Sequence, residues 1–183
     1  MEHFAKISII TINYKQSETT NELLESLQKV SWPNLEIIVV DNNSGLDDLA
    51  NLNITHSNVK IISSKVNLGF AGGNNLGVKS ATGDYIMLLN NDTIVEPGFF
   101  EPMVELLQSS AQIGAVSPKI KYFDQPDTIQ YAGFPGMNPF TLRMRATGGG
   151  EKDLGQHDTV RPTQFAHGCA MMMPRNVVAN VGP

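Results

Sequence analysis

Short apolar runs alternate with helical patterns through the first part of the chain. Runs rich in β-branched residues, typical of buried strands, lie at 7–12, 35–40, 59–63 and 85–89. Apolar residues at helical spacing predict helices at 19–30 and 46–52, before Ser80 and after Gly98. Thr19 and Glu22 form a capping box that predicts the start of the first helix. A last short run, at 115–117, predicts one more strand.

This alternation predicts an α/β fold with a mainly parallel central sheet and helices on both faces, because a helix between two strands brings the chain back to the same end of the sheet. From Pro118 the alternation ends, and glycine, proline and polar residues become frequent, with a mobile loop expected at 148–150. An apolar run at 165–173 predicts a strand, and a helix begins after Pro174. We divide the single domain into residues 1–117 and an incomplete part, 118–183, and expect the chain to be a fragment truncated at its C-terminus.

Composition narrows the class of protein. The 183 residues carry a net charge of −5 and no basic run, so we expect no nucleic-acid partner. Cys169 is the only cysteine, which excludes a disulfide framework and a Cys-rich zinc site. No apolar run approaches the ~20 residues of a transmembrane helix, and no signal peptide is recognisable. We therefore expect a cytoplasmic protein, free in solution or at the inner face of the membrane.

Polar residues collect where the predicted strands end. They form four stretches, at 13–14, 41–43, 67–75 and 90–92. In an open parallel sheet ligands bind outside the carboxyl ends of the strands. Any one polar loop is ordinary, but four at the same edge favour a binding site there.

Two acids in these stretches each allow two interpretations. Asp41, directly after a buried strand, could accept hydrogen bonds from a ribose hydroxyl or a pyrimidine N–H, or it could cap the next helix. Asp92, beside two amides, could share a Mg²⁺ ion with the oxygens of a diphosphate, or it could form a turn before Thr93.

The remaining candidates carry weaker signals. The loop 67–75 is rich in glycine, which permits close backbone approach to a ligand, but it matches neither GxGxxG nor GxxxxGK[ST]. His167 could donate a hydrogen bond to a phosphate or an acceptor hydroxyl, or serve a structural role. Cys169 lies among small and apolar residues, which favours a buried thiol over a nucleophile.

Taken together, five blocks resemble family 2 glycosyltransferases of the GT-A fold, a Rossmann-like αβα sandwich, and within them a rhamnosyltransferase-like branch. The blocks are ISIITINY at 7–14, IIVVDNNS at 37–44, NLGFAGGNNLG at 67–77, GDYIMLLNNDTIV at 83–95 and HGCAMMMP at 167–174. They occur in the family's order and cover nearly the whole chain. The resemblance implies that 1–117 is a nucleotide-sugar-binding half and that 118–183 begins an acceptor-binding half.

The resemblance also implies roles for individual residues. Asp41 is expected to contact the base or ribose of the donor, and the nucleotide is expected to lie among Asn13, Tyr14, Asn67, Gly73 and Asn74. The stretch 90–92 occupies the position of the family's DxD motif, with Asn90 in place of its first acid. Asp92 is then the residue expected to bind Mg²⁺ or Mn²⁺.

The implied reaction is inverting transfer of a hexose or deoxyhexose from a nucleoside diphosphate, dTDP- or UDP-linked, to a hydroxyl of a glycan or lipid-linked acceptor, as in polysaccharide biosynthesis. The family's general base follows the Gly-Pro that ends this sequence, so the catalytic base is expected beyond Pro183. Two alternatives stay open. One is a sugar-nucleotide nucleotidyltransferase, although 7–16 lacks the basic glycine-rich loop that such an enzyme needs. The other is a non-catalytic module that binds sugar nucleotides.

Overall fold

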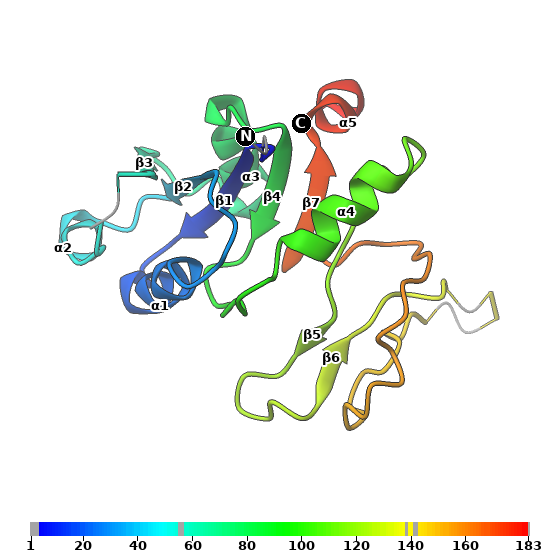
Figure 1. Cartoon of the computed structure of the whole chain (residues 1–183). Helices are drawn as coiled ribbons and strands as arrows, with labels where there is room; N and C mark the ends of the chain where they lie inside the picture. The colour runs from blue at the N-terminus through cyan, green and yellow to red at the C-terminus, as the bar shows by residue number, and fades with distance from the viewer. Residues whose placement is uncertain (1–3, 55–56, 138, 141–142, 183) are drawn as a thin grey trace.

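A five-stranded sheet with helices on both faces forms the body of the molecule (Figure 1). The computed structural model describes residues 4–54, 57–137, 139–140 and 143–182. Its strands are β1 (Ile7–Asn13), β2 (Leu35–Asp41), β3 (Val59–Ser63), β4 (Tyr85–Leu89), β5 (Ile120–Lys121), β6 (Ile129–Tyr131) and β7 (Ala170–Pro174). Its helices are α1 (Ser17–Leu27), α2 (Leu46–Ala50), α3 (Gly69–Ser80), α4 (Glu101–Ser109) and α5 (Arg175–Val181).

The sheet has the order β3-β2-β1-β4-β7. The first four strands are parallel, and β7 is antiparallel to β4. The predicted α/β sandwich with a mainly parallel sheet is therefore confirmed. Because β1 to β4 run the same way, their carboxyl ends lie at one edge, where the polar stretches follow them.

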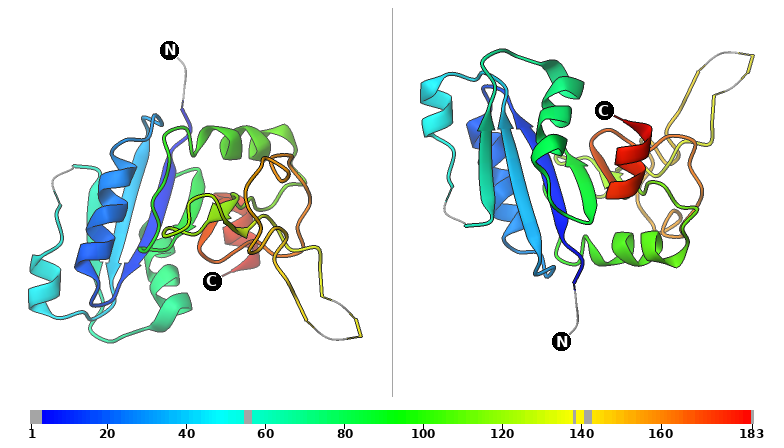
Figure 2. Two further views of the ribbon diagram at one scale, coloured as in Figure 1. Left: turned by 90° about the horizontal axis from the view of Figure 1, so that it is seen from below. Right: turned by 90° about the horizontal axis from the view of Figure 1, so that it is seen from above.

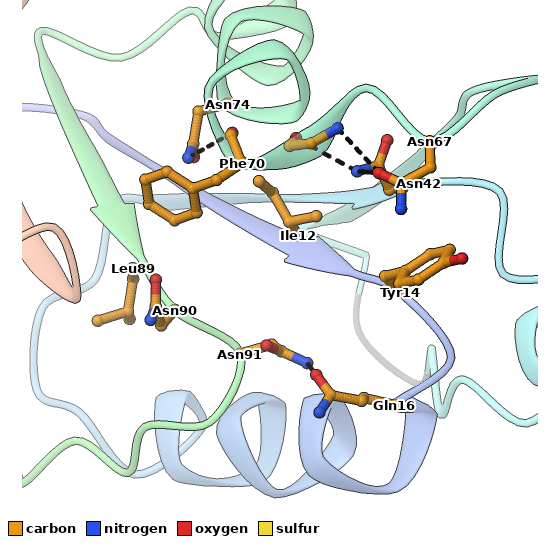
Figure 3. A pocket seen from close by; sticks show the side chains of 11 residues that line it. Ile12, Tyr14, Gln16, Asn42, Asn67, Phe70, Asn74, Leu89, Asn90 and Asn91 are labelled. Carbon is orange, nitrogen blue, oxygen red and sulfur yellow. Dashed lines mark hydrogen bonds between the residues drawn. The ribbon is translucent and has the colours of Figure 1, made fainter.

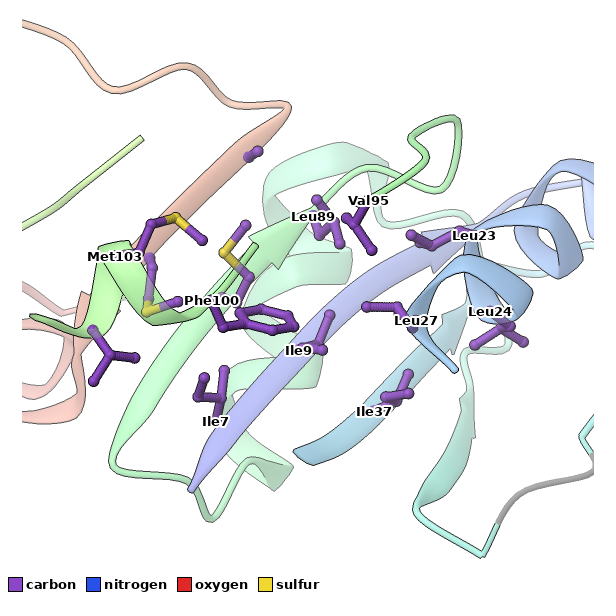
Figure 4. Close-up of a cluster of buried hydrophobic side chains, with 14 of the residues drawn as sticks. Ile7, Ile9, Leu23, Leu24, Leu27, Ile37, Leu89, Val95, Phe100 and Met103 are labelled. Atoms are coloured by element: carbon purple, nitrogen blue, oxygen red, sulfur yellow. The ribbon is translucent and has the colours of Figure 1, made fainter. Parts of the chain in front are cut away.

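Two apolar clusters attach the helices to the sheet. On one face the buried side chains of α1 and α4, and Phe100 just before α4, pack on the strands, with Leu27 and Phe100 near Ile9 in Figure 4. On the other face residues of α3 and α5 contact the alternate strand positions, such as Ile10. Successive side chains of each strand point to opposite faces of the sheet, so each strand contributes to both apolar clusters. The result is the three layers, helices, sheet and helices, seen in Figure 2.

Two sequence predictions were wrong. Residues 115–117 form no strand, because only Val116 makes an isolated bridge, to Met172. The edge of β4 is instead covered by β7, whose register pairs Met172 with Met87. The capping box at Thr19 is also absent. Helix α1 begins two residues earlier, at Ser17, whose backbone N–H donates to the Asp48 carboxylate at 3.1 Å.

The chain leaves the sheet after Val116 and returns at β7. Between them lie the small β5–β6 sheet and the loops that follow it (Figure 1). The stretch 148–150, expected to be a mobile loop, forms a turn held to β6, with Gly150 N–H donating to the Ile129 carbonyl at 2.8 Å. Strand β7 and helix α5 belong to residues 118–183 but pack into the sheet and the helical layer of residues 1–117. The predicted division at residue 117 therefore stays a prediction about which half binds which substrate.

At the opposite edge of the sheet, where β1, β2 and β4 begin, the Glu36 carboxylate links the three strands through hydrogen bonds. Glu36 in β2 accepts hydrogen bonds from the Ser8 hydroxyl of β1 and from the Thr82 backbone N–H, 2.8 Å away, just before β4. Lys6 lies 3.5 Å from the same carboxylate. Burial opposes ionisation of Glu36, but these hydrogen bonds hold its pKa below the ordinary value. Among the described residues, no helix is long and apolar enough to cross a membrane.

Candidate functional site

A pocket of about 270 Å³ opens at the carboxyl ends of β1, β2 and β4, beside the first turn of α3 (Figure 3). Each of the four polar stretches, 13–14, 41–43, 67–75 and 90–92, contributes to its walls, and the other lining residues lie close in sequence to one of these stretches. The lining residues are Ile12, Tyr14, Gln16, Asn42, Asn67, Gly69, Phe70, Asn74, Leu89, Asn90 and Asn91. Four of these residues, Tyr14, Asn67, Asn74 and Asn90, were expected at the site from the sequence. No individual role was predicted for Gln16, Asn42, Phe70 or Asn91.

The Asn42–Asn67 pair fixes the wall between β2 and α3. Asn42 Nδ2 donates to Asn67 Oδ1 at 2.8 Å, and Asn42 Oδ1 accepts the Leu68 backbone N–H at 2.8 Å. Asn67 Oδ1 also accepts the Gly69 N–H at 2.8 Å. Asn42 is buried and its polar atoms are engaged within the protein, whereas Asn67 Nδ2 has no hydrogen-bond partner among the described residues.

Phe70 and Asn74 form the wall on the α3 side. Asn74 Nδ2 donates to the Phe70 carbonyl at 3.0 Å, which leaves Asn74 Oδ1 as an acceptor toward the pocket. The Phe70 ring is 55% exposed, and a Cβ added to Gly168 would lie 3.9 Å from it. An apolar ring beside open amide groups suits a flat, polar-edged ligand.

Gly73 has a packing role in this wall. It is not among the residues that line the pocket, and a Cβ at this position would lie 2.9 Å from the Ile12 side chain. Glycine therefore lets α3 approach β1 closely. Its effect on a ligand would be indirect, through the position of the helix.

Asn13 and Asp41 lie behind the pocket, outside its lining. Asn13 is fully buried and donates to the Asp48 carboxylate at 2.6 Å. Burial opposes ionisation of Asp48, but the bonds from Asn13 and from the Ser17 N–H lower its pKa below the ordinary value. Asp41 is 4% exposed and accepts the Ser44 N–H at 3.2 Å. Ser44 precedes Gly45, the N-cap residue of α2, so Asp41 holds the turn before the helix and does not cap the helix. Contact of either residue with a nucleoside stays a prediction.

Asp92 is exposed at the other end of the site, one residue beyond the pocket wall. No hydrogen bond or ion pair joins its carboxylate to a described residue, and the turn is held instead by Thr93, whose hydroxyl donates to the Asn90 carbonyl at 2.6 Å. The described residues contain no group of three or more His, Cys, Asp or Glu side chains that could hold a metal ion alone. A hard cation could take one oxygen ligand from the exposed Asp92 carboxylate and the others from water and ligand phosphate oxygens.

The turn at 167–169 lies against the same loop. The Asn90 N–H donates to the Cys169 carbonyl at 2.8 Å, and the Cys169 N–H donates to His167 Nδ1 at 3.2 Å. Because Nδ1 accepts, the neutral imidazole carries its proton on Nε2, which no described group engages. The ring packs on Tyr131, with centroids 4.9 Å apart, so His167 is a fixed donor near the loop of Asp92.

Cys169 does not have the properties of a nucleophile. Burial raises the pKa of its thiol to about 11, and the negative charge of Asp92 contributes to the shift. At neutral pH the group is a thiol, as expected from its sequence context.

The pocket lining itself is uncharged. Amides, a phenol, a phenyl ring and aliphatic side chains form its walls, and no Lys, Arg, Asp or Glu is among the described lining residues. Such a surface suits the base and ribose of a nucleotide, which carry hydrogen-bonding groups without net charge. A diphosphate would need its charge balanced outside this pocket, on the side of Asp92.

Comparison with known proteins relates this chain to sugar-transferring enzymes. The family described as Glycosyl transferase family 2 matches residues 8–182. A poly-β-1,6-N-acetyl-D-glucosamine synthase of Staphylococcus epidermidis is 30% identical over 139 residues, which are 71% of this chain and 34% of the relative. A low-salt glycan biosynthesis hexosyltransferase of Haloferax volcanii is 26% identical over 183 residues, 96% of this chain and 55% of the relative.

Solved structures show the same architecture. A mannosyltransferase from Pyrobaculum calidifontis, in complex with GDP-Man and Mn²⁺, has a TM-score of 0.69 at 17% identity and covers 98% of this chain and 47% of its own. Staphylococcus aureus TarS, in complex with UDP-GlcNAc, has a TM-score of 0.66 at 19% identity, over 96% of this chain and 47% of its own. The chain thus spans about half the length of these proteins, and at such identities the likeness concerns the fold.

Proposed function

Because the chain belongs to glycosyl transferase family 2 and has the GT-A fold, we propose that its pocket binds the nucleoside of a nucleoside-diphosphate sugar for inverting transfer. One observation carries the proposal. An uncharged, amide-lined pocket ends beside an exposed carboxylate, Asp92, that no described group engages. A nucleoside-diphosphate sugar has the same arrangement, because its nucleoside is neutral and its diphosphate is charged.

The donor is proposed to lie along the strand ends. Tyr14, Asn67 and Asn74 would contact the nucleoside from the pocket walls, and Asp41 would contact the base or ribose after a small movement of its loop. Asn90 would flank the diphosphate, and His167 Nε2 would donate to a phosphate or to the acceptor hydroxyl. For the donor we favour dTDP-rhamnose first and UDP-linked sugars next, on the sequence blocks shared with the rhamnosyltransferase-like branch.

A divalent cation, Mg²⁺ or Mn²⁺, is proposed to lie between Asp92 and the diphosphate. The site fits it, since an exposed, unpaired carboxylate supplies one oxygen ligand and leaves the other positions to water and phosphate. When bound, the cation would neutralise the charge that develops on the departing nucleoside diphosphate. The Mn²⁺ in the complex of the Pyrobaculum mannosyltransferase supports this choice of metal.

The general base is proposed to lie outside residues 1–183, in sequence beyond Pro183. No carboxylate is among the described residues that line the pocket. Glu151 and Asp153 belong to the loops around β6, where Asp153 pairs with Lys119 at 2.8 Å. The acceptor is proposed to be a hydroxyl of a growing polysaccharide or lipid-linked glycan, at the cytoplasmic face of the membrane.

A transfer assay tests the proposal. The 183-residue chain and a chain extended through the following coding sequence are incubated with Mn²⁺, a glycan acceptor, and dTDP-rhamnose, UDP-GlcNAc or GDP-Man in turn. We expect the extended chain to release nucleoside diphosphate and form a glycoside, with a pyrimidine donor preferred. The shorter chain should bind the donor but transfer at least about 10²–10⁴-fold more slowly, the usual contribution of a general base.

Each other result has a definite meaning. Equal turnover by the two chains would place the base within residues 1–183 and contradict the proposed active site. Formation of pyrophosphate from a sugar phosphate and a nucleoside triphosphate would favour the nucleotidyltransferase. Donor binding by both chains without transfer to any acceptor would favour a non-catalytic module, and preference for GDP-Man would contradict the donor choice.

A further inference from the structure

Two fully buried polar side chains connect the loops that carry Asp41 and Asp92. Thr20 in α1 and Asn13 at the end of β1 are both 0% exposed. Asn91 Nδ2 donates to Thr20 Oγ1 at 3.1 Å, and Thr20 Oγ1 lies 2.9 Å from Asn13 Oδ1. Thr20 has no exposed surface and lies in α1, so an effect of its hydroxyl on binding must pass through its neighbours.

The direction of the Thr20 hydroxyl follows from its surroundings. The Gln16 carbonyl lies 3.0 Å from Oγ1, but it already accepts the Thr20 backbone N–H at 2.9 Å. Asn13 Oδ1 has no other donor among the described residues, and an unsatisfied buried carbonyl oxygen is costly. The hydroxyl therefore donates to Asn13 and accepts from Asn91.

On its other side Asn13 reaches the loop of Asp41. Its Nδ2 group donates to the Asp48 carboxylate at 2.6 Å and to the Ser44 hydroxyl at 3.1 Å. Ser44 in turn donates its backbone N–H to Asp41 Oδ1 at 3.2 Å. With every polar atom matched, the Asn13 amide has one stable orientation, and the hydrogen bonds run without a break from the loop after β4 to the loop after β2.

We propose that Thr20 is a positioning residue whose hydroxyl, through Asn13 and Asn91, sets the loop of Asp92 at the correct distance from the loop of Asp41. The inference rests on the proposed function, which places the nucleoside near one loop and the metal-bound diphosphate near the other. Without the hydroxyl, Asn91 Nδ2 keeps only the Gln16 Oε1 atom, 3.2 Å away, as its acceptor. Asn13 loses the donor to its Oδ1, but its Nδ2 bonds to Asp48 and Ser44 still tie it to the loop of Asp41. The metal end of the site should then be affected more than the nucleoside end.

The chain offers a matched set of variants. Thr20→Val removes the hydroxyl and keeps the shape, and Thr20→Ser restores it. Thr11→Val makes the same chemical change at another threonine that is 0% exposed, whose Oγ1 has no partner among the described residues. Thr11→Val should therefore leave binding unchanged.

Calorimetry with two probes separates positioning from a general loss of structure. We expect Thr20→Val to bind a nucleoside diphosphate with Mn²⁺ about tenfold more weakly, the scale of one lost buried hydrogen bond. Binding of the nucleoside monophosphate without metal should be unchanged, and Thr20→Ser should match the parent with both probes. Equal weakening of both probes, or none, would overturn the inference.

Two further measurements apply if Thr20→Val does not fold or if the unmodified chain binds neither probe. If Thr20→Val does not fold, Asn91→Ala cuts the same connection from its exposed side, and unchanged diphosphate binding by that variant overturns the inference. If the unmodified chain binds neither probe, the proposed function fails. The inference is then decided by amide hydrogen exchange at 90–93, which Thr20→Val should accelerate and Thr11→Val should not.

Discussion

Asp92→Ala should remove the gain in nucleoside-diphosphate affinity that Mn²⁺ or Mg²⁺ gives to the unmodified chain. Asp92 is the one carboxylate proposed to hold the cation, and no described side chain competes for it. A bond of this kind to a charged group contributes about 1.5–3 kcal/mol, roughly a ten- to hundredfold change in affinity. Titration calorimetry of both chains, with and without metal, measures the difference.

Glu96→Ala is the matched control for this experiment. Glu96 is an exposed acid in the same loop, and its side chain has no partner among the described residues. The control should keep the full effect of the metal. If the parent binds the diphosphate equally well with and without metal, or if Asp92→Ala keeps the gain, the cation does not bind where we place it.

The largest loss of stability is expected for Glu36→Ala, at the opposite edge of the sheet. The substitution removes the acceptor of the Ser8 hydroxyl and of the Thr82 N–H, and it leaves Lys6 Nζ with the Thr82 hydroxyl, 2.6 Å away, in place of an ion pair. Hydrogen bonds to a charged group contribute about 1.5–3 kcal/mol each, so we expect the free energy of unfolding at neutral pH to fall by about 2–4 kcal/mol. Urea unfolding, with Glu25→Ala on the surface of α1 as control, measures the change.

Glu36→Ala should also weaken the dependence of the free energy of unfolding on pH in the acid range. Since the pKa of Glu36 is lowered in the folded protein, its contribution is complete above the pKa of the unfolded chain and is lost as pH falls through the folded pKa. The difference between parent and variant should therefore shrink below the ordinary carboxyl pKa of 4.5. A difference that stays constant from neutral pH to acid would show that ionised Glu36 has no special role.

The parts of the fold that follow from local pattern were predictable. The four parallel strands are continuous apolar runs, and the polar residues after them mark the edge where the pocket lies. A strand was predicted at 165–173, where β7 lies, but its antiparallel pairing with β4 was not, because that pairing depends on a return of the chain from residue 116 to residue 170. Nothing near Met172 in the sequence specifies that partner.

The parts of the site that depend on distant partners were not predictable. Thr19 has the sequence of a cap, yet α1 begins at Ser17 because Asp48, 31 positions later, accepts its N–H. Asn13 ends the first strand like a ligand-binding residue, but in the fold Thr20 and Asp48 engage its amide. A polar residue at the end of a strand correctly predicts the edge of the sheet where the pocket lies. Whether that residue is buried or reaches the pocket depends on loops elsewhere in the chain.

We place a nucleoside diphosphate and its cation at the carboxyl ends of β1, β2 and β4. Paramagnetic broadening of amide signals by Mn²⁺, in the presence of dTDP or UDP, is the decisive test of this placement. We expect the strongest broadening at 90–92 and 167–169, weaker effects at Tyr14 and Asn67, and none at Val30 and Trp32, which line a separate pocket together with Leu27 of α1. Broadening centred on Asp153 and Asp158, or spread evenly over the surface acids, would contradict it.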